Sequence, residues 1–194
     1  MTESWDDHAD GWDSNEAVIL YCQKAYEALL NIVDLEGRKV LDFGCGTGLL
    51  TERISGHANS VVAIDPSEKM ISALTGKHLN NVHAINGELT QELIDNDEVL
   101  RSGFDIIVAS SALAFVPDYQ QTLKLLKQLL RKGGFLVQWD WLKKSEEPGI
   151  GFSEELIELA LKQARFSKYS TSVPFSMESP NGSMKVVMGI AENA

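Results

Sequence analysis

Cysteine is scarce in this sequence: only Cys22 and Cys45 occur among 194 residues. Two cysteines cannot form the disulfide framework of a small secreted domain, and they show no metal-ligand spacing with the four histidines. A chain of this length buries roughly 70% of its unfolded surface as one domain, so it needs no disulfides for stability. We therefore expect a single domain in a reduced, cytoplasmic compartment, with no metal site.

Basic residues are also few, since 17 Lys and Arg stand against 28 Asp and Glu, which gives a formal net charge of −11. The longest basic run is Lys143-Lys144, so the chain is poorly suited to nonspecific binding of nucleic acid or of an anionic membrane. No segment approaches the ~20 apolar residues that span a bilayer, and residues 1–10 are acidic, unlike a secretory signal. We expect a small-molecule or protein substrate, with neither nucleic acid nor membrane as partner.

Short apolar runs alternate with helical patterns along most of the chain. Apolar spacing near the helical period predicts an amphipathic helix over residues 17–34. Beyond it, the expected strands are 39–43, 60–64, 82–86, 104–109 and 135–141, and the expected helices are 49–55, 67–74, 91–100, 118–130 and 153–163. This alternation predicts an α/β fold with a mostly parallel sheet and helices on both faces.

The end of the chain shows a different pattern. Two further strands are expected at 169–177 and 185–191, and the residues between them include Pro180 and the turn signal Asn181-Gly182. Since this spacing is too short for a crossover helix, the last strand should run antiparallel to its neighbour.

The segment KVLDFGCGTGLLT, residues 39–51, joins an expected strand to an expected helix through three glycines. Glycines at such a junction let backbone N–H groups approach a ligand closely. The dinucleotide fingerprint would run from Gly44 and Gly46 to a third glycine at position 49, where this chain has Leu49. NAD is therefore disfavoured, and no P-loop motif is present.

Acidic residues stand at three successive strand ends. Asp42 lies at the mouth of the glycine loop, where a carboxylate repels a pyrophosphate and attracts an ammonium or sulfonium. Asp65 follows the next strand at the position from which an acid binds ribose hydroxyls, and Glu88 follows the third and could accept from an exocyclic amine. Each feature alone has a simpler explanation as a turn, a helix cap or a solvated acid. Together they favour a ligand with cationic, ribose and adenine parts.

Four segments follow one another in an order and spacing that resemble those of a known family: VLDFGCGTG, VVAIDPSEKM, FDIIVASSALAFVPD and LLRKGGFLVQWDW. The chain resembles the class I S-adenosylmethionine-dependent methyltransferases, in the group that includes ubiquinone and menaquinone biosynthesis enzymes. The resemblance implies a Rossmann-like sheet of seven strands in the order 3-2-1-4-5-7-6, with strand 7 antiparallel. It covers nearly the whole chain, so we expect one methyltransferase domain over residues 1–194, with residues 1–35 as a helical cap over the site.

The resemblance also implies a cofactor, S-adenosylmethionine, with S-adenosylhomocysteine as product. The cofactor-binding residues that it implies are Asp42, Phe43, Gly44, Gly46, Asp65, Met70, Glu88, Leu89 and Ala109. The first four would line the methionine half, and Asp65 would bind the ribose. Met70 would pack on the adenine, although a methionine at this spacing is equally compatible with the core. Glu88 would take the adenine amine, the Leu89 backbone would face the ring, and the Ala109 carbonyl would accept from the methionine ammonium.

Two segments depart from the pattern of relatives. Many relatives carry His-His or His-Trp where this chain has Ala114-Phe115, so a base from that position is missing. The segment 109–112 reads ASSA, which lacks the Asn/Asp-Pro-Pro-aromatic form of DNA amine methyltransferases and argues against that activity.

Methyl transfer from a sulfonium requires alignment more than acid–base help, so a general base is optional. The candidate bases are His8 and Asp140. Gln138 and Asp140 share one face of an expected strand near its carboxyl end, which suggests a pocket, although strand ends also emerge into solvent. The candidate substrate-binding residues are Trp5, Trp12, Phe115, Gln138 and Asp140, and the two tryptophans are equally suited to clamping the cofactor.

These features predict methyl transfer to a small-molecule acceptor by in-line displacement. Two alternatives stay open from the sequence: a protein methyltransferase, and a noncatalytic module that binds S-adenosylmethionine. The acceptor atom and the oligomeric state are not indicated by the sequence.

Overall fold

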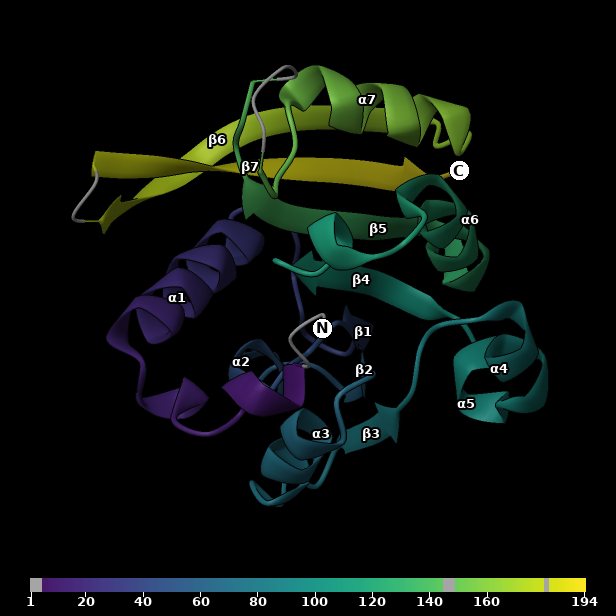
Figure 1. Ribbon diagram of the computed structural model, residues 1–194. Helices are drawn as coiled ribbons and strands as arrows, with labels where there is room; N and C mark the ends of the chain where they lie inside the picture. Colours follow the sequence, from purple (N-terminus) through teal and green to yellow (C-terminus); the bar gives the residue numbers. More distant parts are fainter. Residues whose placement is uncertain (1–4, 145–148, 180–181) are drawn as a thin grey trace.

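A seven-stranded sheet forms the centre of the computed structural model, which describes residues 5–144, 149–179 and 182–194 (Figure 1). The strands are β1 Lys39–Phe43, β2 Ser60–Asp65, β3 Val82–Asn86, β4 Phe104–Ser110, β5 Leu130–Trp141, β6 Lys168–Ser179 and β7 Gly182–Asn193. Their order is β3-β2-β1-β4-β5-β7-β6. Strands β1 to β5 pair in parallel, whereas β7 runs antiparallel to both β5 and β6. The expected strand order and direction are confirmed.

Helices connect the strands and cover the sheet. The α-helices are α1 Glu16–Leu30, α2 Leu49–Ser55, α3 Glu68–Thr75, α4 Gln91–Asn96, α5 Glu98–Arg101, α6 Tyr119–Leu129 and α7 Glu154–Gln163. Three short 3-10 helices are η1 Trp5–His8, η2 Trp12–Ser14 and η3 Leu113–Phe115. Several α-helices begin at a side chain that accepts from the first-turn backbone, as Ser67 does for α3 and Ser153 for α7.

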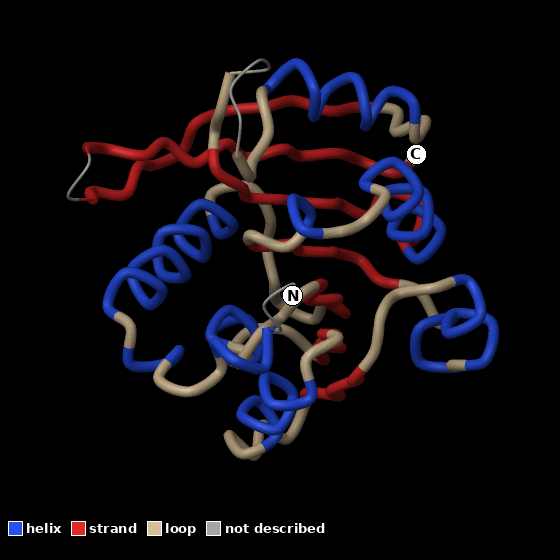
Figure 2. The backbone as a smooth tube through the Cα atoms, in the orientation of Figure 1, coloured by secondary structure: helices blue, strands red, loops and turns tan. Residues whose placement is uncertain are grey.

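Helices pack on both faces of the sheet, and neighbouring residues of each strand point to opposite faces. Val40 and Val61 pack with α1 and α2 on one face, while Leu41 and Val62 belong to the core under α4 to α7 on the other. Figure 1 shows these two groups of helices on either side of the strands, and Figure 2 shows the strands as the layer between them. This arrangement brings the carboxyl ends of β1 to β5 to one edge.

Several expected boundaries were wrong. The first helix ends at Leu30 rather than at residue 34, because the chain turns there and inserts Val33 and Leu35 into the core. The helix expected over 91–100 is two helices, since Asp97 is extended and caps α5. Leu130 begins β5 instead of ending a helix. Of the expected hairpin turn, Pro180 and Asn181 lie outside the described residues.

Candidate active site

The loop between β1 and α2 places three glycines at the carboxyl edge of the sheet, each with positive φ: +68° at Gly44, +54° at Gly46 and +81° at Gly48. A Cβ on Gly44 would lie 2.3 Å from the Cβ of Ala112, so this position must remain glycine for the loop to pack against the chain that follows β4. At Gly46 the nearest atoms to such a Cβ lie 3.9 Å away, on Met70 and Trp12. These are ordinary van der Waals distances, so the surroundings of Gly46 are less tight than those of Gly44.

Asp65, at the end of β2, joins this loop to the start of α3. Its carboxylate is buried and accepts two backbone hydrogen bonds of 2.9 Å, from Gly46 N–H at Oδ2 and from Ser67 N–H at Oδ1. Burial raises the pKa of Asp65, and the two backbone bonds act against that rise. The acid thus holds the loop in place while its remaining lone pairs stay available for a ligand.

Asp42, at the end of β1, lies under the same loop. Its Oδ2 accepts from the Thr51 hydroxyl at 2.6 Å. Burial raises the pKa of Asp42 to about 7, the Thr51 hydroxyl lowers it, and the charge of Asp65 raises it. Within the described chain, no basic side chain is among the causes of the raised pKa of either acid. Two buried acids that repel each other form a site that fits a cationic ligand such as a sulfonium with an ammonium.

The junction after β3 lies beside Asp65. The Asn86 side chain donates to the Asp65 carbonyl at 3.2 Å, and Gly87 N–H donates to the same carbonyl at 3.0 Å. Leu89 is half-buried against the core, whereas Glu88 is exposed. Met70, in α3, is 2% exposed, and its sulfur reaches toward Gly46.

The segment after β4 connects the two halves of the edge. Ala109 pairs with Phe43 of β1 on one side and with Gln138 of β5 on the other. Two residues later Ser111 adopts a φ of +52°, and its N–H donates to the Trp139 carbonyl at 2.7 Å. A left-handed serine is a strained conformation that is concentrated at functional sites.

The first described residues lie over the glycine loop. Asp6, in η1, accepts from the Ser67 hydroxyl at 2.5 Å and from Lys69 N–H at 3.2 Å. Asp13, in η2, accepts from the Thr47 hydroxyl and forms an ion pair with Lys77 at 3.0 Å. Two acids therefore hold residues 5–14 against both the glycine loop and the start of α3.

Aromatic rings accompany this segment. The rings of Trp5 and Phe115 meet edge to face with centroids 4.9 Å apart, and Trp12 lies 6.2 Å from Trp5. His8 is exposed, with its ring 5.6 Å from that of Trp5. The three rings expected to wall a site are thus brought together, while His8 is on the solvent side.

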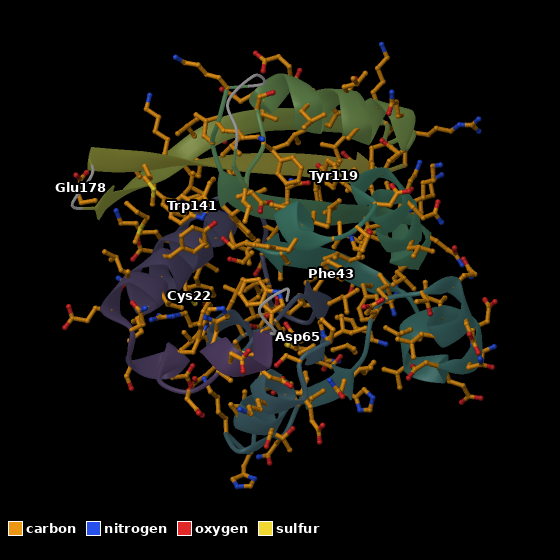
Figure 3. The ribbon with its side chains drawn as sticks, in the orientation of Figure 1. Cys22, Phe43, Asp65, Tyr119, Trp141 and Glu178 are labelled. Carbon is orange, nitrogen blue, oxygen red and sulfur yellow. The ribbon has the colours of Figure 1, made fainter. Side chains whose placement is uncertain are left out.

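The carboxyl end of β5 is polar and buried. Gln138 and Asp140 are each 1% exposed, so the alternative that this strand end emerges into solvent was wrong. Figure 3 shows Tyr119 and Trp141 on the β5 side of the edge, with Phe43 and Asp65 on the β1–β2 side. Burial raises the pKa of Asp140 well above that of an ordinary carboxyl.

Four residues of this region were missed from the sequence. Asp6 and Asp13 were two of many acids in an acidic segment, although the spacing WDDHADGWD repeats a tryptophan followed by an acid. Thr51 and Tyr119 carried no sequence signal, because their roles depend on Asp42 and Gln138 in neighbouring elements.

Two classes of feature are absent from residues 5–144, 149–179 and 182–194. No group of three or more His, Cys, Asp or Glu side chains there is arranged to hold a metal ion. None of the helices in those ranges has the length and apolar character needed to cross a membrane.

Comparison of the chain with known proteins identifies its family. Residues 41–136 match the model of a methyltransferase domain. The chain is 31% identical over 168 residues to the mitochondrial ubiquinone biosynthesis O-methyltransferase of Rattus norvegicus, which covers 82% of this chain and 48% of that protein. The chain belongs to the class I S-adenosylmethionine-dependent methyltransferases.

Other relatives agree with this assignment. The ubiquinone biosynthesis O-methyltransferase of Coxiella burnetii is 35% identical over 104 residues, which cover 54% of this chain and 44% of that enzyme. The solved complex of DhpI with S-adenosylhomocysteine has the same fold, with a TM-score of 0.71, 20% identity and coverage of 98% of this chain and 93% of that one. The chain spans about half the length of the curated relatives that it matches.

Family membership confirms the expected fold class and makes S-adenosylmethionine the cofactor. The buried acids Asp42 and Asp65 beside the glycine loop fit this cofactor on chemical grounds, since it carries positive charge on sulfur and nitrogen.

Proposed function

We propose that this methyltransferase transfers the methyl group of S-adenosylmethionine to a small-molecule acceptor by in-line displacement. The observation that carries the proposal is the pair of buried acids, Asp42 and Asp65, at the glycine loop with no basic partner among the described residues. A cationic ligand relieves the repulsion between them.

The cofactor is proposed to lie across the ends of β1 to β4. Its methionine half contacts Asp42, Phe43, Gly44, Gly46 and the Ala109 carbonyl; its nucleoside half contacts Asp65, Met70, Glu88 and Leu89. Support comes from the hydrogen bond between Gly46 and Asp65 and from the approach of Met70 to Gly46. Glu88 is the least supported of these residues, because its side chain is exposed in solvent.

Residues 1–35 are proposed to cap the site. Their described part supports this through the Asp6 and Asp13 contacts and through the Trp5, Trp12 and Phe115 rings. Aromatic walls bind an apolar or aromatic acceptor and exclude water from the reacting atoms.

The chain's own residues contribute alignment. When bound, the sulfonium supplies a methyl group on a good leaving group: an acceptor lone pair forms the new bond to carbon as the carbon–sulfur bond breaks. Holding donor and acceptor in line supplies much of the rate in such a displacement. The candidate base His8 lies on the solvent side. The acceptor proton is then lost to water or to a weak base.

The relatives support an oxygen acceptor, because those from Rattus norvegicus and Coxiella burnetii are named O-methyltransferases of ubiquinone biosynthesis. We extend to this chain the methylation of a small molecule, not the identity of that molecule. A cytoplasmic location and the absence of nucleic-acid partners, expected from the cysteines and the acidic charge, remain part of the proposal.

Thermal unfolding with ligands tests the cofactor site. A ligand that binds only the folded state raises the midpoint in proportion to the logarithm of its concentration over its Kd. We expect S-adenosylmethionine and S-adenosylhomocysteine to raise the midpoint and NAD to leave it unchanged. Asp65→Asn should lose most of the shift, and Asp95→Asn, at an exposed acid in α4, should keep it. No shift with either sulfur ligand contradicts the proposal.

Release of S-adenosylhomocysteine across a panel of small acceptors then tests catalysis. Turnover with a small molecule supports the proposal and excludes a noncatalytic binding module. Cofactor binding with turnover only on protein substrates would instead favour a protein methyltransferase.

A further inference from the structure

Two polar side chains sit side by side at the carboxyl end of β5. Gln138 and Asp140 are two residues apart, so they share the face of the strand that is covered by α6 and η3. Both are 1% exposed. Buried polar groups in native proteins are nearly always hydrogen-bonded, so any unpaired atom here needs an explanation.

Only one of the two polar side-chain atoms of Gln138 has a hydrogen-bond partner among the described residues. The Tyr119 hydroxyl donates to its Oε1 at 2.7 Å, which fixes the orientation of the amide. Its Nε2 has no hydrogen-bond partner among the described residues. The amide thus presents two N–H donors that need an acceptor.

The carboxyl group of Asp140 also has one oxygen without a hydrogen-bond partner among the described residues. The backbone N–H of Ala114, in η3, donates to its carboxyl group, and Oδ2 has no partner within the described chain. Burial raises the pKa of Asp140 well above its usual range, which favours the neutral form of this carboxyl group. A neutral carboxyl both donates and accepts a hydrogen bond.

The position of these atoms relates them to the proposed methyl donor. Phe43, Ala109 and Gln138 occupy one row of paired residues across β1, β4 and β5. Two strand spacings separate the ends of such a row, which is roughly 10 Å. Asp140 lies two residues further toward the carboxyl edge. The unpaired atoms therefore lie at the carboxyl edge of the sheet, on the β5 side of the glycine loop.

The local charges restrict what these atoms can bind. No lysine or arginine of the described residues is among the causes that shift the pKa of Asp140 or of Tyr119. A carboxylate or phosphate would be desolvated here without a cation, at high cost. An ammonium cannot accept from the Gln138 amide. A neutral hydroxyl or carbonyl oxygen accepts from the amide and pairs with a carboxyl group.

We propose that Gln138 and Asp140 bind the methyl acceptor through a neutral hydroxyl or carbonyl oxygen, with Tyr119 orienting the Gln138 amide. This inference rests on the proposed methyltransferase function and adds the chemical class of the acceptor. Asp140 acts as a hydrogen-bonding group and not as a general base. Because η3 covers Asp140, the acceptor reaches it only when η3 shifts.

Three probes that differ in one polar group test the inference: benzyl alcohol, benzoate and benzylamine. Each is added at millimolar concentration to the full chain saturated with S-adenosylhomocysteine. The 1H–15N NMR signals of the Gln138 side-chain amide and of the Ala114 backbone report binding. We expect benzyl alcohol to shift both signals in a saturable manner, and benzoate and benzylamine to leave them unchanged.

Variants make the test specific. The Ala114 signal should titrate at least about fivefold more weakly in Gln138→Met and in Asp140→Leu, as expected for the loss of one hydrogen bond. It should titrate normally in Asp140→Asn, which keeps a neutral polar group, and in Gln121→Met, where the glutamine is exposed on α6. Tyr119→Phe should weaken binding while the fold is kept, since only a hydroxyl is lost.

The outcomes separate the two proposals. Failure of the wild-type chain to bind S-adenosylhomocysteine contradicts the proposed function. Normal binding of S-adenosylhomocysteine overturns the inference alone in any of three cases: a response to benzoate or benzylamine, no response to benzyl alcohol, or an unchanged response in Gln138→Met and Asp140→Leu. In turnover with an identified acceptor, loss of kcat in Asp140→Asn with unchanged KM would identify a base and also overturn it.

Discussion

The Ser67 hydroxyl donates a 2.5 Å hydrogen bond to Asp6, a residue 61 positions earlier in the chain. The backbone N–H of the same serine donates to Asp65, the candidate ribose-binding acid. Ser67 thus joins the segment over the site to the carboxylate within it. The N-terminal segment and the candidate ribose-binding acid therefore share a hydrogen-bonding residue.

Asp6→Asn should loosen this segment. The substitution removes the negative charge that faces the Ser67 hydroxyl and the Lys69 N–H, so it weakens two charge-assisted hydrogen bonds. We expect S-adenosylhomocysteine to dissociate about 3- to 10-fold faster, as measured by stopped-flow fluorescence of the tryptophans. Asp7→Asn, at the exposed neighbouring acid, is the matched control. Equal dissociation rates in the two variants would show that the Asp6 contacts do not hold the segment closed.

Thr51→Val should destabilise the fold beneath the glycine loop. The valine keeps the shape of the side chain but leaves the buried Asp42 without its hydroxyl donor, which costs about 1–3 kcal/mol. Urea unfolding measures the loss. Thr75→Val is the control, since that hydroxyl is exposed and bonds only to a carbonyl of its own helix. A loss no larger than in the control contradicts the role given to Thr51.

Gly44→Ala should be more damaging than Gly37→Ala. Both glycines have positive φ, +68° and +71°, so both substitutions carry the same backbone strain of about 1–2 kcal/mol. A Cβ at Gly37 meets nothing within 4 Å, whereas a Cβ at Gly44 lies 2.3 Å from Ala112. Urea unfolding should therefore show a distinctly larger loss for Gly44→Ala, along with loss of S-adenosylhomocysteine binding. Similar losses in the two variants would mean that the contact with Ala112 is not tight.

Stability should fall as the pH rises toward neutral. The folded pKa of Asp42 is raised from 3.8 to about 7, so the folded state binds a proton that the unfolded state has lost between those values. The pKa values of Asp65 and Asp140 are raised as well, which acts in the same direction. Urea unfolding between about pH 5 and about pH 8 should show a decline approaching 1.4 kcal/mol per pH unit for each full proton.

Asp42→Asn identifies the main source of that decline. The asparagine amide cannot ionise. Up to pH 7, the slope of the free energy of unfolding against pH should therefore flatten by about the contribution of one proton. The free energy of unfolding of the variant at neutral pH should equal or exceed that of the wild type. A slope unchanged by the substitution would show that Asp42 does not titrate in this range.

Much of the fold was predictable because strand and helix patterns repeat locally. The strands at 39–43 and 82–86 and the helix at 49–55 were found with their observed bounds. The break at Asp97 was missed because a buried Ile94 and a buried Leu100 fit one helical stripe as well as two short helices. The strand order came from the family resemblance, since nonlocal pairing leaves little trace in a single sequence.

The candidate site, like the fold, has parts that the sequence predicts and parts that it does not. Asp42, Asp65 and the glycines stand at strand ends, so their meeting at one edge follows from parallel topology. The covering segment was expected, but not its anchors, because the bonds from Asp6 to Ser67 and from Asp13 to Thr47 join distant segments. For Gln138 and Asp140 the sequence left a pocket and a solvent-exposed strand end equally possible. Their burial, at 1% exposure each, decides against the second.

A crystal structure of the protein with S-adenosylhomocysteine tests the central claim most directly. We expect the ribose hydroxyls within hydrogen-bond distance of the Asp65 carboxylate, the methionine ammonium near Asp42 and the Ala109 carbonyl, and the N-terminal segment over the ligand. A structure in which S-adenosylhomocysteine binds away from the glycine loop, or in which Asp65 contacts no part of the ribose, would contradict it.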